Sequence, residues 1–396
     1  MNGSRWVVSP ARWFLRTAAI VLLAGLLGGC STVGSMFGSL FGSAPPKPAP
    51  QQPFTPQRTL RAVWQQRVEA VPFPLVVAVS RGAGGEQFTV AGGDGTVLAL
   101  DAASGRELWR ASAGAKLAAG VGSDGRYASV VTRDNELVTF DAGRVVWRER
   151  LASRVAGPPL VAGERVFAMG VDRAVHAFDA ADGRRLWSLQ RPGDALTLSQ
   201  PGVVAAFKNT LLVGQGPRLA GVDPDTGALR WEVAVAAPRG TNEVERLADL
   251  LGPAGRAGDV VCARAFQAAV GCVDAERGTL RWSKVVGGNE PVAVDDRYVV
   301  GADASDRISA WRLASGDVAW ATDRFLHRRL SAPTATGDGV VFGDAEGIVH
   351  LLARDDGRTL ARLATDGSPV AAAPARAGST LLVVTRSGGL HALRVE

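Results

Sequence analysis

Residues 92–110 read Gly92-Gly93-Asp94-Gly95-Thr96-Val97-Leu98-Ala99-Leu100-Asp101-Ala102-Ala103-Ser104-Gly105-Arg106-Glu107-Leu108-Trp109-Arg110. The alternation of side chains over residues 96–101 is typical of a β-strand, and an Asp-x-x-x-Gly turn joins it to a second strand that ends in a Trp. The same pattern returns at residues 174–187 and 221–231. A pattern that recurs in this way indicates a protein built from structural repeats.

The repeat can be counted on the Trp that ends each copy. Seven Trp and one Ala occupy this position, and in every copy after the first a Gly lies four residues earlier. The positions are Trp64, Trp109, Trp147, Trp187, Trp231, Trp282, Trp320 and Ala361. They are spaced by 38 to 51 residues, the length of a four-stranded propeller blade. The strand periodicity excludes a repeat of two helices.

The two ends of the chain complete one blade between them. Residues 59–65 resemble the last strand of a copy, and residues 388–396 resemble the third strand of another. Pairing these ends closes the ring and leaves no blade half-paired. The sequence therefore predicts an all-β fold, an eight-bladed β-propeller of four-stranded antiparallel blades over residues 59–396. The innermost strand of the second copy is expected at Leu117–Val121, and each repeated Trp is expected to pack between neighbouring blades.

The N-terminus has the pattern of a secretory signal. Arg12 and Arg16 precede an apolar run over residues 18–27, which is too short for a comfortable membrane span. The run ends in Leu27-Gly28-Gly29-Cys30, which resembles the bacterial lipobox. That resemblance implies a signal peptide over residues 1–29 and an acylated Cys30. The Gly, Ser and Pro content of the residues that follow predicts a tether, so residues 30–58 would hold the lipidated Cys and a Gly/Ser/Pro-rich tether. A plain signal peptide with an incidental Cys is the alternative.

The charge and the motifs of the chain argue against several functions. The formal net charge is +6, and the three Arg in the first sixteen residues account for half of it. Because the rest is spread along the chain, nucleic-acid binding is not expected. There is no phosphate-binding loop, no G-x-S-x-G motif and no adjacent Cys pair. His176, His350 and His391 fall at one repeated strand position, and His327 has no evident metal partners. We expect no catalytic, cofactor-binding or metal-binding residues.

Cys262 and Cys272 fall on two neighbouring strands of one copy. A three-residue turn at residues 266–268 would place them directly opposite each other. A cross-strand disulfide and two buried free thiols are both compatible with this placement.

Two adjacent connections between copies are longer than the others, at residues 191–201 and 239–251. All such connections emerge on one face of a propeller, so these two are expected side by side. They mix leucines with Arg and carboxylates, a composition common in protein contact sites. Drift in loop length, with the leucines folded back onto the blades, is the alternative.

The repeat resembles that of quinoprotein (PQQ) propellers, and the chain as a whole resembles the BamB family of propeller lipoproteins from the outer-membrane β-barrel assembly (BAM) machinery. Residues 241–249, TNEVERLAD, are similar to that family's T-E-I-D-R-L-S-D-V-D loop. Residues 325–333 and 343–350 also resemble the family.

This resemblance implies a non-enzymatic scaffold, lipid-anchored on the periplasmic face of the outer membrane. Such a scaffold binds the POTRA domains of BamA, and through BamA the other BAM subunits, and it assists folding and insertion of β-barrel outer-membrane proteins. Unfolded outer-membrane proteins are further candidate partners. The alternative is a periplasmic PQQ-dependent dehydrogenase-like enzyme.

The resemblance also implies which residues contact the partner. The implied residues are Leu196, Thr197, Leu198, Ser199, Arg246, Leu247, Asp249 and Leu251. Two of them depart from the family: Ser199 stands where its first loop has Arg, and Leu251 stands where its second loop has Asp. Charge pairing is therefore expected to be weaker, or to be carried by Asp249 and Arg246 alone.

Overall fold

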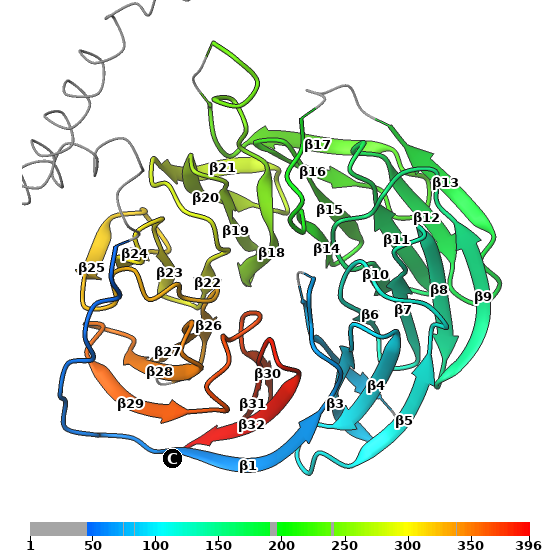
Figure 1. The fold of residues 1–396 in the computed structure, drawn as a ribbon. Helices are drawn as coiled ribbons and strands as arrows, with labels where there is room; N and C mark the ends of the chain where they lie inside the picture. Colours follow the sequence, from blue (N-terminus) through cyan, green and yellow to red (C-terminus); the bar gives the residue numbers. More distant parts are fainter. Residues whose placement is uncertain (1–45, 74, 83, 191–195, 239–240, 338) are drawn as a thin grey trace, which may run out of the picture. The chain divides into compact units, whose positions relative to one another are not determined.

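The structure, a computed structural model, describes residues 46–396 apart from residues 74, 83, 191–195, 239–240 and 338. The predicted signal peptide, Cys30 and the first part of the predicted tether lie outside the described residues. Pro48–Glu396 form one compact unit. Its strands make eight four-stranded antiparallel sheets arranged around a central axis (Figure 1), which confirms the eight-bladed propeller. Within the described part of the chain, no helical segment has the length and hydrophobicity to cross a bilayer.

Each sheet is one blade, and its strands are consecutive in the chain from the axis outward. The first four blades contain β2 (Ala78–Gly82), β3 (Gly85–Ala91), β4 (Thr96–Asp101) and β5 (Glu107–Ser112); β6 (Gly122–Ser123), β7 (Tyr127–Val131), β8 (Glu136–Asp141) and β9 (Arg144–Arg150); β10 (Leu160–Ala162), β11 (Arg165–Met169), β12 (Val175–Asp179) and β13 (Arg185–Leu189); and β14 (Val204–Phe207), β15 (Thr210–Gln215), β16 (Arg218–Val222) and β17 (Leu229–Ala234).

The next four blades follow the same order, except that the last takes a strand from the N-terminal side. They contain β18 (Leu250–Ala257), β19 (Val260–Ala265), β20 (Ala269–Asp274) and β21 (Thr279–Lys284); β22 (Ala293–Val294), β23 (Tyr298–Ala302), β24 (Ile308–Arg312) and β25 (Val318–Thr322); β26 (Thr334–Ala335), β27 (Gly339–Gly343), β28 (Ile348–Ala353) and β29 (Thr359–Ala364); and β30 (Ala375–Ala377), β31 (Thr380–Val384), β32 (Gly389–Val395) and β1 (Leu60–Arg67).

The ring closes as predicted. β1 pairs antiparallel with β32, with a register that runs from Leu60 opposite Val395 to Arg67 opposite Gly389. β1 therefore supplies the outermost strand of the blade whose other strands end the chain. This pairing leaves the last blade with four strands like the others.

The repeated Trp packs between blades, also as predicted. The ring of Trp64 lies against Gly105 of the next blade, where an added Cβ would come within 2.5 Å of it. The indole N–H of Trp64 donates to the carbonyl of Ala102 at 3.1 Å. Trp320 repeats the arrangement with Gly357. A ring this close requires a residue without a side chain, which explains why the Gly recurs with the Trp.

The chain ends explain why the eighth position is Ala361. In the next blade around the ring, β32 is the end of the chain and β1 comes from the other terminus, so no turn and no Gly lie there to receive an indole. Ala361 is instead buried in a cluster with Leu60 and Leu360.

The innermost strand of the second blade is shorter than the sequence indicated. The strand expected at Leu117–Val121 is wrong: the paired strand is β6 at Gly122–Ser123, and Leu117 makes only an isolated bridge to Thr132. Space near the axis is restricted. An added Cβ at Gly122 would lie 1.9 Å from the Pro159 carbonyl oxygen, so neighbouring inner segments approach each other at backbone distance.

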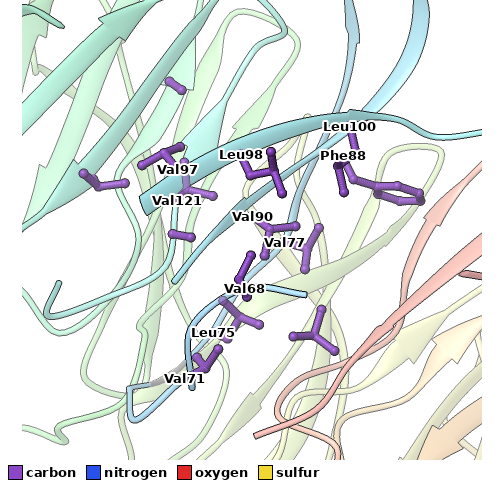
Figure 2. Packing of buried hydrophobic residues seen from close by; sticks show 14 of the residues in the cluster. Val68, Val71, Leu75, Val77, Phe88, Val90, Val97, Leu98, Leu100 and Val121 are labelled. Atoms are coloured by element: carbon purple, nitrogen blue, oxygen red, sulfur yellow. The ribbon is translucent and has the colours of Figure 1, made fainter. Parts of the chain in front are cut away.

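The middle strands are buried on both faces because every blade packs between two others. All four residues from Val97 to Leu100 in β4 are fully buried, which is why the alternation in this strand is apolar on both sides. Figure 2 shows that side chains of the segment between β1 and β2 join this core. The labelled residues are Val68, Val71, Leu75, Val77, Phe88, Val90, Val97, Leu98, Leu100 and Val121.

Candidate functional site

The two long connections meet in the structure. The first follows β13 and the second precedes β18, and both lie between outer and inner strands of adjacent blades. Gly202 forms an isolated antiparallel bridge with Leu251, and the amide of Gly252 donates to the carbonyl of Pro201 at 2.8 Å. The described parts of these connections, residues 196–201 and 241–251, therefore form one surface, which we call the double-loop surface.

Asp249 and Arg173 hold the two loops together. The Asp249 carboxylate accepts a hydrogen bond from the Leu198 amide at 2.9 Å and another from Arg173 Nη2 at 3.2 Å. The same Nη2 donates to the carbonyl of Leu196 at 3.1 Å. The side chains of Arg173 and Asp249 are only 16% and 17% exposed, so this charge pair is shielded from most of the solvent.

Sequence reasoning missed Arg173. It lies in the turn between β11 and β12 with a φ of 65°, at the place that Gly95 occupies in the first copy with a φ of 104°. Residues with a side chain rarely adopt this conformation. A comparison of this turn across the copies would have revealed an Arg where the first copy has Gly.

The predicted contact residues differ in their exposure. Leu196, Thr197, Leu198, Arg246 and Leu247 are half-buried. In addition, Ser199 is exposed and accepts a hydrogen bond from Arg154 Nη2 at 2.9 Å.

Leu251 is a correction to the predicted contact set. Its side chain is 2% exposed because it follows the first residue of β18 into the sheet, opposite Arg264 of β19. A buried side chain is not available to a partner, and we leave Leu251 out of the contact surface.

Residues 241–247 form a turn that is held by its own side chains. Asn242 Oδ1 accepts from the Glu245 amide at 2.9 Å, and the Glu245 carboxylate accepts from the Thr241 amide at 2.7 Å. These bonds resemble a capping box. The bond from the Thr241 amide lowers the pKa of Glu245. The turn presents Val244, which is 72% exposed, to the solvent.

A small cavity lies beneath the double-loop surface. Its volume is about 50 Å³, and its lining includes Met169, Val171, Leu198 and Leu250 together with the Arg173–Asp249 pair. A small cavity that can receive one side chain of a partner is a common feature of protein contact sites.

Cys262 and Cys272 are opposite each other in the pairing of β19 with β20, and they form a disulfide with a Cα–Cα distance of 4.0 Å. Both side chains are fully buried.

We expect both cysteines to resist alkylation after unfolding without reductant, which mass spectrometry would test. Replacing both by Ser should lower the free energy of unfolding by about 2–3 kcal/mol, because the bond closes a short loop in the unfolded chain. Two thiols that are alkylated in the unreduced protein would contradict the disulfide.

A second cavity, of about 560 Å³, lies at the centre of the propeller and is lined mainly by Pro, Ala and Val. Its polar lining includes Glu290, and burial raises the pKa of this carboxyl to about 7. Among the described residues, no three His, Cys, Asp or Glu side chains come together as metal ligands would.

The raised pKa of Glu290 predicts that the stability of the protein depends on pH. Because its folded pKa of about 7 lies above the ordinary value of 4.5, its contribution is complete below pH 4.5 and is lost as the pH rises through 7. The free energy of unfolding from urea titrations should fall by about 2 kcal/mol between pH 5 and pH 8 on account of this group. Glu290→Gln should remove that part of the slope, whereas Asp134→Asn, at an exposed turn, should not. An unchanged slope in Glu290→Gln would refute the assignment.

Comparison with known proteins assigns the family. A family model described as outer membrane protein assembly factor BamB matches residues 93–322. An outer membrane protein assembly factor BamB from Bordetella pertussis is 37% identical over 384 residues, which cover 95% of this chain and 96% of the relative. The chain belongs to the BamB family. A second BamB, from Burkholderia pseudomallei, is 36% identical over 88% of this chain and 91% of its own length.

Solved structures agree on the fold. The crystal structure of BamB from Moraxella catarrhalis superposes with a TM-score of 0.75 at 21% identity and covers 85% of this chain and all of that one. Quinohemoprotein alcohol dehydrogenase from Comamonas testosteroni has a TM-score of 0.64 at 16% identity, covers 85% of this chain and 76% of that one, and shares the fold alone.

Two arginines bond to predicted contact residues of the double-loop surface. Asp249 pairs with Arg173 in the turn between β11 and β12. The guanidinium of Arg154, in the connection between β9 and β10, donates to Ser199. Both arginines lie outside the two loops, so positive charge is supplied here from adjacent parts of the ring.

Proposed function

We propose that this protein is a scaffold of the outer-membrane protein assembly machinery and that its double-loop surface binds the periplasmic POTRA domains of BamA. Membership of the BamB family and the names of its relatives as outer membrane protein assembly factors support this function. The observation that carries the proposed site is the Arg173–Asp249 pair, which joins two loops that are distant in sequence into one surface.

The proposed contact has an apolar part and a charged part. Leu196, Leu198 and Val244 supply apolar surface, and the cavity of about 50 Å³ has room for the end of one apolar side chain from the partner. Arg154 and Arg246 supply positive charge at the edge. Other BAM subunits are reached through BamA, and unfolded outer-membrane proteins are candidate clients.

We further propose that Cys30 is acylated and holds the protein on the periplasmic face of the outer membrane. The lipobox-like sequence supports this anchor, and so do relatives named for assembly of outer-membrane proteins. The proposed role is non-enzymatic, in keeping with the relatives' names as assembly factors.

Co-purification tests the proposed function. The full lipidated chain should retain the periplasmic region of BamA when both are extracted in detergent, and it should retain it from purified components as well. Failure of a folded chain to bind that region would overturn the proposal. Quinone-dependent alcohol oxidation by the purified protein would favour the dehydrogenase-like alternative.

A further inference from the structure

Residues 49–58, which we call the strap, lie along the outside of the β26–β29 blade before the chain enters β1 (Figure 1). At one end the Ala49 amide donates to the carbonyl of Leu326, in the connection between β25 and β26, at 2.8 Å. At the other end the Gln57 amide donates to the carbonyl of Leu360 in β29 at 3.0 Å. The strap therefore crosses this blade from one face of the propeller to the other.

A buried arginine holds the first end of the strap. Arg328 is 4% exposed, and its Nε and Nη2 donate to the Asp344 carboxylate at 2.9 and 2.7 Å. Asp344 also bonds Nε2 of His350 at 3.0 Å. The remaining Nη1 of Arg328 donates to the carbonyl of Ala49 at 2.9 Å. Because the Asp344 pair fixes the guanidinium, this donor is oriented toward the strap at little further entropic cost.

Arg362 and Arg358 hold the middle and the second end. Arg362 donates to the side chain of Gln51 at 2.8 Å, and its guanidinium carbon lies 5.0 Å from the centre of the Phe54 ring. Such a cation–π contact adds to the hydrogen bond. Arg358 Nε donates to the side chain of Gln57 at 3.2 Å. The surface thus offers guanidinium donors, and the strap offers carbonyl and amide oxygens with one aromatic ring.

We propose that this surface of the β26–β29 blade is the binding site for the chain's own strap, and that the lipid tether therefore leaves the propeller here and not at β1. The inference rests on the proposed acylation of Cys30. The tether then spans 18 residues from Cys30 to Pro48, at most about 60 Å, whereas 29 residues to Thr59 would allow about 100 Å.

The point at which the tether leaves the propeller also determines which edge of the ring is held nearest the membrane. Leu326 lies in a connection between an outer and an inner strand, as do the loops of the double-loop surface, so both lie on the same face of the ring. The connection after β25 is four blades away from the one after β9 and is therefore diametrically opposite it. A tether that leaves beside Leu326 holds that edge nearest the membrane.

Fluorescence quenching on vesicles tests this inference. The full lipidated chain carries a fluorophore at Asp323→Cys or at Ala152→Cys, two exposed positions on opposite connections of the same face. On phosphatidylethanolamine and phosphatidylglycerol vesicles with a headgroup quencher, quenching at position 323 should exceed that at position 152 by about twofold or more, since contact quenching falls steeply with distance within the reach of the tether.

Variants of the strap test its docking on the β26–β29 blade without changing the lipid anchor proposed at Cys30. Gln51→Ala with Phe54→Ala removes two contacts with Arg362 and leaves the blades untouched, so the difference between the labels should disappear. Amide exchange of Ala49 and Gln57 should quicken by about tenfold or more in the same variant. The matched control is Gln52→Ala with Thr55→Ala, whose side chains are exposed and make no hydrogen bond within the described part of the chain, and it should behave as the native chain.

Equal quenching at the two positions, with vesicle binding intact, would overturn the strap site and leave the anchor standing. A difference that survives in Gln51→Ala with Phe54→Ala would also overturn it. A native chain that fails to bind vesicles would overturn the anchor proposed at Cys30 and the strap inference together.

Discussion

Asp249→Ala is expected to weaken binding to the periplasmic region of BamA by about 30-fold or more, or roughly 2 kcal/mol. The carboxylate holds the Leu198 amide and Arg173 at once, so its removal frees both loops. It also leaves the largely buried Arg173 without its carboxylate partner. Titration calorimetry with the purified region would measure the loss.

Two further variants test whether the loss of affinity comes from the contacts of the Asp249 carboxylate. Asp249→Asn keeps an acceptor for the Leu198 amide but removes the charge that faces Arg173, so its loss should be intermediate. Asp182→Ala, an exposed carboxylate in the same blade as Arg173, should bind as the native chain. Native affinity in a folded Asp249→Ala protein would show that the double-loop surface is not the binding site.

Leu196→Ala with Leu198→Ala tests the apolar part of the same surface. These side chains are half-buried at the junction of the loops, and Leu198 lines the small cavity beneath them. Their truncation should raise the Kd for the periplasmic region of BamA, while the backbone amide of residue 198 stays protected from exchange by its bond to Asp249. In Asp249→Ala, by contrast, that amide should exchange faster. Amide exchange therefore distinguishes the loss of apolar contacts in the double Leu variant from the loss of loop geometry in Asp249→Ala.

Arg264→Met is expected to lower the free energy of unfolding by at least about 3 kcal/mol. Arg264 is fully buried, and its guanidinium donates to four backbone carbonyls in and beside the connection after β21. The acceptors belong to Val286, Gly287, Glu290 and Ala302, at 2.7 to 3.2 Å. Met fills similar space but leaves these carbonyls without donors.

The site of Arg264 is built for a guanidinium. An added Cβ at Gly288 or Gly301 would lie 2.4 or 2.9 Å from its nitrogens, so both glycines make room for it. Burial lowers the pKa of Arg264 to about 10, and the group therefore keeps its charge at neutral pH.

Urea unfolding would measure the effect, with Arg184→Ala as a control at a surface arginine that is 68% exposed. The control should change stability by less than about 0.5 kcal/mol. Arg264→Lys should fall between the two, because an ammonium cannot reach all four carbonyls. Equal stability of Arg264→Met and the native chain would refute the role given to these bonds.

The architecture was predictable because its signals are local and repeated. Strand alternation, the Asp-x-x-x-Gly turn and the Trp recur every 38 to 51 residues, so each copy supports the others. Ring closure followed from two incomplete copies at the ends. The length of the inner strand in the second blade did not follow, because it depends on how closely neighbouring blades approach each other near the axis, as at Gly122.

The loops were predictable as a surface but not in their internal contacts. Their adjacency follows from the blade order, and their composition pointed to protein binding. Arg173 lies 76 residues from Asp249, and nothing in either local sequence pairs them. Leu251 shows the opposite error, since a residue aligned with a contact position enters a strand and is buried.

The number of blades, the closure of the ring and the position of each Trp depend on short patterns that the chain repeats, and for these the residues themselves are sufficient. The pairing of Arg173 with Asp249, the four carbonyls around Arg264 and the docking of the strap on Arg328 and Arg362 depend on segments far apart in sequence. The partners in these contacts are main-chain carbonyls or single side chains, and no repeated sequence pattern marks them. Their contacts exist because the packing of the blades holds these separate segments within hydrogen-bond distance.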